Sequence, residues 1–78
     1  MKVRNLLIEI RKKKNLTIRQ AAKGIGISYP ALNKIENCEY DGSIIVWKKI
    51  QKFYDIKLKD VWSYMTTYKY VENPKKSK

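Results

Sequence analysis

The residues best suited to do chemistry lie on the outer face of a short helix that should begin after Ser28. Four side chains face away from the expected core there, namely Tyr29, Pro30, Asn33 and Lys34. An asparagine amide can pair with adenine N6 and N7, and a lysine ammonium can reach guanine O6 or N7, each with about 1–3 kcal/mol of discrimination. Tyr29 can hydrogen-bond a phosphate, while Pro30 offers only apolar contact with a thymine methyl. This face indicates recognition of base edges in duplex DNA, and an ordinary solvated helix face is the plainer alternative.

Positive charge is concentrated in the same half of the chain. The net charge is +11, and residues 1–34 hold nine basic side chains against one acidic one, a net of +8. Residues 35–62 carry five of each sign, and residues 63–78 carry a net of +3. This asymmetry predicts a polyanionic partner, although lysines also keep a surface solvated. Three basic residues in this half are candidate phosphate contacts: Arg11, Lys14 and Arg19.

The residue types argue against catalysis and metal binding. The chain has no histidine and a single cysteine, Cys38, so the usual zinc-ligand spacings do not occur. The acidic residues Glu36, Glu39 and Asp41 do not have the spacing of a calcium loop. We therefore expect no enzyme, no cofactor and no metal. With no long apolar run and no secretory signal at the charged N-terminus, we expect no membrane association and a cytoplasmic location.

The first helix is predicted from an apolar stripe. Val3, Leu6, Leu7 and Ile10 recur at i, i+3, i+4 and i+7. Basic residues follow in the last turn, where they suit the helix dipole. Asn15 can then adopt the left-handed conformation that ends a helix.

Two further helices are predicted on either side of a glycine turn. Thr17 opens a capping box with the glutamine three positions later, and this helix should run to about residue 25. Gly26 can supply the positive φ of the turn. Ser28 then caps the next helix, with Pro30 in the first turn, where an N–H would be unpaired anyway.

Caps and stripes also predict a fourth and a fifth helix. Ser43 follows an Asp-Gly turn signal and can cap the fourth, whose buried stripe is Ile44, Trp47, Ile50 and Tyr54. In the short fifth helix we expect inward packing of Val61 and Trp62.

This ordered set of helices resembles the phage repressor and Cro family of helix-turn-helix DNA-binding domains. The similarity covers about residues 5–62 and is strongest in LT–Q–A–GIGIS, in ALNKIEN and in SIIVWKKIQKFYDIKL. It implies an all-α, five-helix repressor-like fold, with the Tyr29–Lys34 face toward the bases. In that family an arginine late in the first helix often pairs with a glutamate ending the third, which implies a structural ion pair of Arg11 with Glu36. The implied phosphate contacts are Arg11, Lys14, Thr17, Arg19, Gln20 and Asn37.

The chain departs from the family pattern at several contact positions. Ile18 replaces a glutamine that often touches phosphate, so this contact should move to Arg19 or Gln20. Cys38 replaces the usual glycine, and because a left-handed conformation would strain a cysteine, we expect a different helix exit. Two acidic loop residues should repel phosphate: Glu39 and Asp41.

The character of the chain changes after residue 64. Residues 65–71 are rich in β-branched and aromatic side chains and could form a short strand, a continuation of the fifth helix, or an ordered arm. We therefore divide the chain into a DNA-binding domain (1–64), a C-terminal extension (65–72) and a disordered basic tail (73–78). The aromatic area predicts a homodimer formed by the fifth helix and the extension, with strand pairing across the two-fold axis. The dimerisation candidates are Trp62, Tyr64, Tyr68 and Tyr70.

The sequence favours a sequence-specific regulator, most simply a repressor, that binds a double-stranded DNA operator as a dimer. Two alternatives stay open. One is an antitoxin or other protein-interaction module with a protein partner, and the other is a nucleic-acid binder that uses charge alone.

Overall fold

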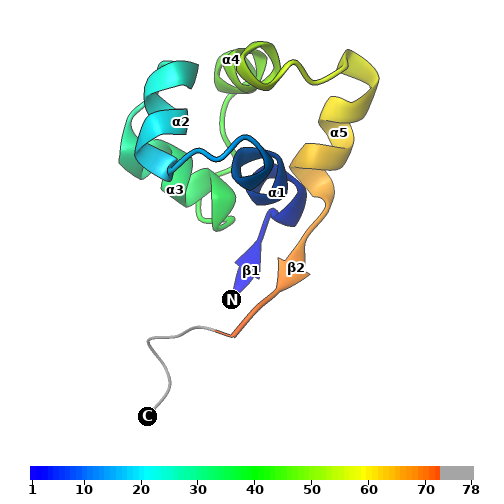
Figure 1. Ribbon diagram of the computed structural model, residues 1–78. Coiled ribbons are helices and arrows are strands. Elements are labelled where there is room, and N and C mark those ends of the chain that lie inside the picture. The colour runs from blue at the N-terminus through cyan, green and yellow to red at the C-terminus, as the bar shows by residue number, and fades with distance from the viewer. Residues whose placement is uncertain (73–78) are drawn as a thin grey trace.

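A computed structural model describes residues 1–72, and the predicted disordered tail (73–78) lies outside the described residues. The five expected helices are present (Figure 1), together with two short strands. The elements in chain order are β1 (Lys2–Val3), α1 (Asn5–Lys13), α2 (Ile18–Ile25), α3 (Tyr29–Glu36), α4 (Ile44–Tyr54), α5 (Leu58–Thr66) and β2 (Lys69–Tyr70).

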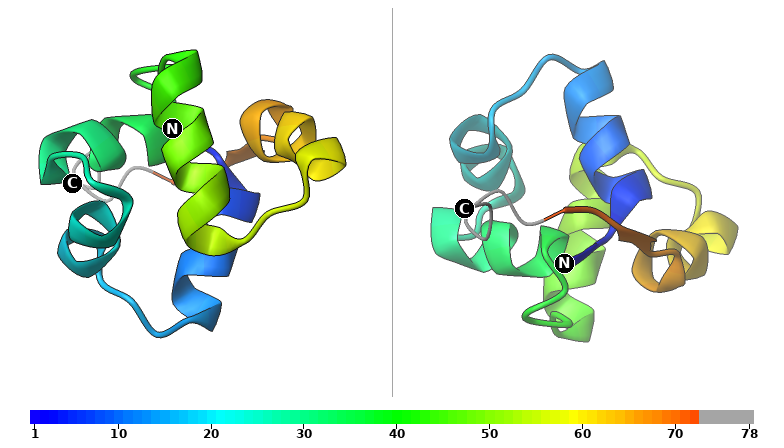
Figure 2. Two further views of the ribbon diagram at one scale, coloured as in Figure 1. Left: turned by 90° about the horizontal axis from the view of Figure 1, so that it is seen from above. Right: turned by 90° about the horizontal axis from the view of Figure 1, so that it is seen from below.

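The core is built around α4. Seen from above, α4 crosses the middle of the molecule, with α2 and α3 on one side of it and α5 on the other (Figure 2). Trp47, Ile50 and Tyr54 recur at i, i+3 and i+7 on its buried face. Side chains from the other elements close the cluster: Leu7, Ala21, Ala22, Ile25, Leu32, Ile35 and Ile56.

The three capped helix starts, those of α2, α3 and α4, are confirmed, because each cap depends on hydrogen bonds within one turn. The Thr17 hydroxyl accepts from the Gln20 N–H, and the Gln20 side chain accepts from the Thr17 N–H, which completes the capping box. Ser28 and Ser43 cap α3 and α4 by the same local rule.

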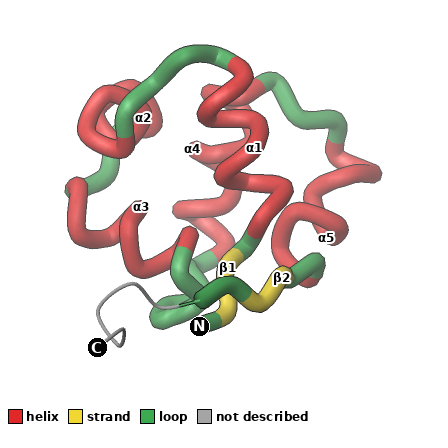
Figure 3. The backbone as a smooth tube through the Cα atoms, turned by 60° about the horizontal axis from the view of Figure 1, so that its bottom comes forward, coloured by secondary structure: helices red, strands yellow, loops and turns green. Residues whose placement is uncertain are grey.

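The N-terminal boundary differs from the prediction. Val3 is buried as expected, but it lies on β1 and not on the first helix. β1 pairs antiparallel with β2, with Lys2 opposite Tyr70 and Val3 opposite Lys69 (Figure 3). The apolar stripe hid this boundary, because a buried residue two positions before a helix fits a helical period and a strand equally well.

The C-terminal extension contains both a helical part and a strand. α5 continues to Thr66, and β2 follows and pairs within the same chain. The two strands lie side by side at one end of the molecule (Figure 3).

The prediction of burial is wrong for two residues of the expected core. Ile44 is 77% exposed and Trp62 is 70% exposed. Ile44 starts the first turn of α4, one turn before the buried stripe, at a place that no element of residues 1–72 covers. α5 turns Val61 and Met65 toward the core, so Trp62, the next residue after Val61, points about 100° away.

The exit of α3 also differs from the expectation. Cys38 keeps the left-handed conformation, with φ of 60°. The Glu39 N–H bonds to the Lys34 carbonyl at 2.8 Å and the Cys38 N–H to the Ile35 carbonyl at 3.3 Å, which is a Schellman ending. These bonds hold a conformation that costs a non-glycine residue about 1–2 kcal/mol.

Candidate nucleic-acid interface

The candidate interface begins with the rigid turn between α2 and α3. Gly26 has φ of 95°, a left-handed conformation that glycine adopts without steric cost. Its N–H donates to the Ala22 carbonyl at 2.9 Å. Two residues later the Ser28 hydroxyl accepts from the Ala31 N–H at 3.1 Å. The turn therefore sets where α3 starts and which of its faces turns outward.

Three of the four predicted base-contacting residues are exposed on α3. These are Tyr29, Pro30 and Lys34. The fourth, Asn33, is half-buried, and its amide oxygen accepts from the Asn37 amide at 3.3 Å. Asn33 would have to share or break this bond to make a bidentate contact with adenine.

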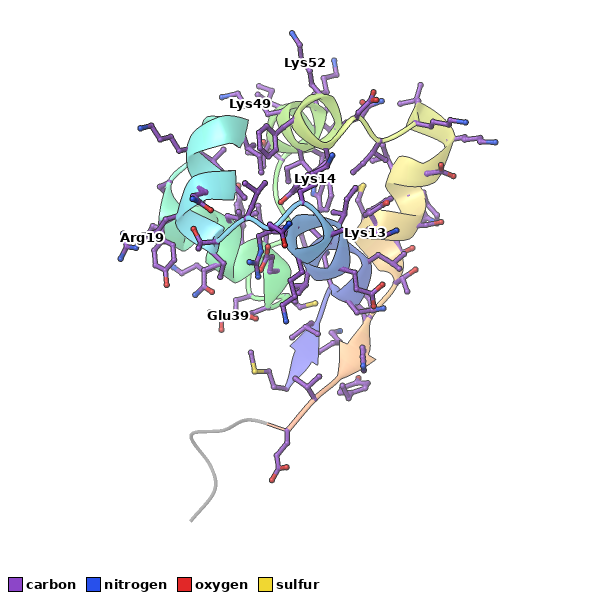
Figure 4. The ribbon with its side chains drawn as sticks, viewed as in Figure 1. Lys13, Lys14, Arg19, Glu39, Lys49 and Lys52 are labelled. Carbon is purple, nitrogen blue, oxygen red and sulfur yellow. The ribbon has the colours of Figure 1, made fainter. Side chains whose placement is uncertain are left out.

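A shallow hollow of about 400 Å³ lies beside this face. Lys34 of α3 lines it together with Glu39 and Tyr40 of the α3–α4 loop (residues 37–43). A positive and a negative side chain thus share one outward-facing hollow, and Glu39 points outward next to α3 (Figure 4). The loop therefore belongs to the same surface as the outer face of α3.

Arg19 connects α2 to this face. Its guanidinium lies over the ring of Tyr29, 4.5 Å from the ring centroid. Figure 4 shows Arg19 at the outer edge of the molecule, beyond α2. The stack holds a positive charge next to the first residue of α3. No local sequence pattern predicts this pairing, because a contact between two helices depends on how the helices cross.

The other phosphate candidates are less uniform. Lys14, Thr17 and Gln20 are exposed around the start of α2, but Thr17 and Gln20 also form the capping box. Asn37 is half-buried and bonded to Asn33.

The predicted phosphate contact of Arg11 does not agree with the structure, because the Arg11 guanidinium is hydrogen-bonded inside the protein. Nε donates to Glu36 Oε2 at 2.8 Å, Nη2 donates to Glu36 Oε1 at 3.2 Å, and Nη1 donates to the Leu16 carbonyl at 2.9 Å. The side chain is only 11% exposed. Arg11 and Glu36 thus form the bidentate pair that the family resemblance implies, and Arg11 is not free to bind DNA.

The partner carboxyl is deeply buried. Burial raises the pKa of Glu36, while the hydrogen bond and the charge of Arg11 act in the opposite direction. The pair joins the end of α1 to the end of α3, so it helps to set the position of α3.

Basic residues on α4 lie elsewhere. Lys49 and Lys52 point outward from α4, on the side of the molecule away from α3 (Figure 4). Positive charge is therefore not confined to the predicted interface.

The four predicted dimerisation residues differ in their exposure and surroundings. Trp62 and Tyr70 are exposed, but Tyr64 is half-buried and borders a cavity that Leu6 and Ile10 of α1 also line. Tyr68 has the ammonium of Lys2 4.4 Å from its ring centroid. On α5, the residue that accompanies Trp62 is Leu58, one turn earlier and 78% exposed.

Sequence reasoning missed one buried residue altogether. Arg4 was counted only as positive charge, yet it is 2% exposed and bonds to three separate segments. No local pattern marks it, since its partners lie 31 to 61 positions away in the chain.

Two further observations concern the described part of the chain. In residues 1–72, no group of three or more histidine, cysteine, aspartate or glutamate side chains is arranged to hold a metal ion. None of the helices described is both long and apolar enough to cross a membrane.

Comparison with known proteins agrees with this geometry. The helix-turn-helix family model matches residues 7–61, which include α2, the turn and α3. An uncharacterized HTH-type transcriptional regulator of Methanocaldococcus jannaschii is 36% identical over 62 residues, which cover 80% of this chain and 94% of that protein. No solved structure matches the chain significantly. The chain therefore belongs to the Cro/C1-type helix-turn-helix family, which makes it a DNA-binding regulator and not an enzyme.

Proposed function

We propose that this protein is a sequence-specific regulator of transcription that places α3 in the major groove of an operator and acts as a repressor. The observation that carries the proposal is the outer face of α3, with Lys34 and Tyr29 exposed on a helix held by the α2 turn and by the Arg11–Glu36 pair. The relative named as a transcriptional regulator supports it. A cytoplasmic location goes with this role.

Base reading and phosphate binding divide between two groups of residues. Tyr29, Pro30, Asn33 and Lys34 face the base edges, and Tyr29 and Lys34 are the exposed hydrogen-bond donors among them. Arg19 is held beside the start of α3 by Tyr29 and contacts phosphate. The remaining phosphate contacts come from Lys14, Thr17, Gln20 and Asn37.

Selection of bound sites from random duplex DNA, followed by footprinting, tests this proposal. We expect a defined motif. Lys34→Ala should relax preference at one position, with a loss of about 1–3 kcal/mol on the preferred base. Arg19→Ala should weaken binding to all sequences alike and reduce the salt slope by about one.

Lys52→Ala is the matched control, because it removes an exposed lysine from the side away from α3. Equal affinity for selected and random duplex would refute sequence-specific reading and favour a binder that uses charge alone. A promoter fused to a reporter tests the sign of regulation, and activation by the protein would overturn the repressor role.

We further propose a homodimer that uses α5. Leu58 and Trp62 lie one turn apart on its outer face and are 78% and 70% exposed. Ile44 of α4 lines the same apolar groove as Leu58 and is 77% exposed. A second copy suits this surface because one α3 reads only a few base pairs, and paired half-sites about 34 Å apart require two.

Analytical ultracentrifugation with and without an operator duplex tests the dimer. Trp62→Ser should shift the protein toward monomer and lower affinity for an inverted repeat. Tyr70→Ser separates the two versions of the interface, since it changes dimerisation only if β2 takes part. A monomer at high micromolar concentration, alone and on DNA, would refute the dimer and leave the groove as a surface for a different protein.

A further inference from the structure

Arg4 is the most completely engaged polar side chain outside the candidate interface. It is 2% exposed, and three of its nitrogens donate within the protein. Nε donates to the Met65 carbonyl at 3.0 Å, and Nη1 donates to the carbonyls of Ile35 at 2.7 Å and Tyr40 at 3.2 Å. Nη2 donates to Asp41 Oδ1 at 3.1 Å.

These acceptors come from three different parts of the chain. Ile35 lies in the last turn of α3, Met65 lies in the last turn of α5, and Tyr40 and Asp41 lie in the α3–α4 loop. The carbonyl ends of two helices carry partial negative charge, which suits a buried guanidinium. One side chain thus ties the end of α3, its following loop and the end of α5 together.

The β2 end of the chain also reaches this site. The Arg4 guanidinium lies 5.6 Å from the ring centroid of Tyr68 and 5.8 Å from that of Trp47. The indole N–H of Trp47 donates to the Asp41 carbonyl at 2.7 Å. The α3–α4 loop is therefore held by Arg4 and Trp47, and Arg4 is in turn held by the segment that leads into β2.

We propose that Arg4 is a positioning residue that couples the C-terminal segment around Tyr68 to the α3–α4 loop, so that a segment outside the DNA interface controls how tightly DNA is held. The inference rests on the proposed DNA-binding function. Tyr40 is the link, since its carbonyl accepts from Arg4 and its residue lines the hollow beside α3 with Lys34.

A purely structural arginine would behave differently. It would change the free energy of unfolding and leave the affinity of the folded protein unaltered. A positioning arginine changes the affinity of protein that is still folded, because the loop no longer meets the DNA backbone in one conformation.

Two neighbouring residues of the same segment provide a pair of variants. The Tyr68 ring lies over the Arg4 guanidinium, whereas the Thr67 side chain is exposed and does not contact Arg4 in residues 1–72. Tyr68→Ala should raise the Kd for the selected duplex about five- to tenfold, while the base preference and the salt slope stay the same, because the α3–α4 loop carries no lysine or arginine. Thr67→Ala should leave the Kd unchanged, and equal effects of the two variants would overturn the coupling.

A double-mutant cycle then tests whether Tyr68 acts through Arg4. Arg4→Lys keeps the positive charge but loses the forked guanidinium group. It therefore makes fewer hydrogen bonds to the loop and the helix ends, while its long side chain avoids leaving an empty cavity. Once Arg4→Lys is present, Tyr68→Ala should cost less than in the wild type. Strictly additive effects would overturn the proposal. Circular dichroism at each step establishes that all variants are folded.

A readout without DNA separates this inference from the proposed function. In a Trp62→Phe background, Trp47 is the remaining tryptophan and reports the α3–α4 loop through its bond to Asp41. Tyr68→Ala should change the Trp47 fluorescence, and Thr67→Ala should not. If the wild type selects no DNA sequence, the proposed function fails, but the fluorescence measurement still tests whether Tyr68 acts on the α3–α4 loop. If the wild type binds and only the Tyr68 effect is missing, the inference alone fails.

Discussion

Replacement of Arg11 by methionine should destabilise the protein more than any surface change. The variant leaves Glu36 without its partner, and that residue is 2% exposed. An unpaired buried charge costs about 3–5 kcal/mol, and the Leu16 carbonyl that loses its donor adds about 1 kcal/mol. A chain of 78 residues has a stability on the order of 4–12 kcal/mol. The total loss of about 4–6 kcal/mol is a large fraction of this stability, and Tm should fall by at least about 16 °C.

The loss should also depend on pH in a defined direction. Burial raises the pKa of Glu36 above its ordinary value of 4.5, and removal of Arg11 takes away the main opposing effect. A raised folded-state pKa means that the stability tied to the protonated group is fully present below the unfolded pKa. It is lost as pH rises through the folded pKa. Arg11→Met should therefore recover stability as pH falls from 7 toward 4.5.

Urea denaturation at pH 7 and pH 5, followed by tryptophan fluorescence, measures both effects. Lys13→Met is the control, since it removes an exposed charge from the same helix. The double variant Arg11→Met/Glu36→Met should regain most of the stability, because apolar side chains often replace a buried ion pair without net cost. A loss below about 1 kcal/mol, or one equal at both pH values, would refute a buried charge as the cause.

Three further variants test backbone conformation, packing and titration. Cys38→Gly should stabilise the protein by about 1 kcal/mol, because φ of 60° suits glycine, and an equal gain in Cys38→Ala would show that the conformation is not the reason. Gly24→Ala should cost about 1–3 kcal/mol in thermal unfolding, because the added Cβ would clash with the Phe53 ring, and a stable variant would show that the ring moves freely. Burial raises the pKa of Tyr54 to about 12, so one of the six tyrosines should ionise late in an ultraviolet titration. The contribution of the protonated Tyr54 hydroxyl to stability is fully present below pH about 10 and is lost as pH rises through 12. A late phase that persists in Tyr54→Phe would assign it to another residue.

Much of the helical framework follows from local signals. The Thr17 capping box, the Gly26 turn and the Ser28 cap each involve bonds across at most five residues, so sequence spacing alone reveals them. The Trp47, Ile50 and Tyr54 stripe was likewise visible, since the helical period places these residues on one face.

The predictions that were wrong concern edges and exposure. The apolar pattern extended the first helix back to Val3 and turned Trp62 inward. Both depend on what lies opposite, which is β2 for Val3 and no described element for Trp62. The helical repeat of apolar residues predicts which residues share one face of a helix, but it does not predict which part of that face another element covers.

The sequence by itself determined the caps, the turn, the basic half of the chain and the family to which it belongs. The tertiary structure alone decided that Arg4 is buried, that Arg11 is unavailable to phosphate and that Arg19 stacks on Tyr29. The physical reason is the length scale of the interactions. Caps and turns form within one turn of helix. By contrast, Arg4 donates to acceptors 31 to 61 residues away and Arg11 pairs with Glu36, 25 residues away, and only packing brings these groups together.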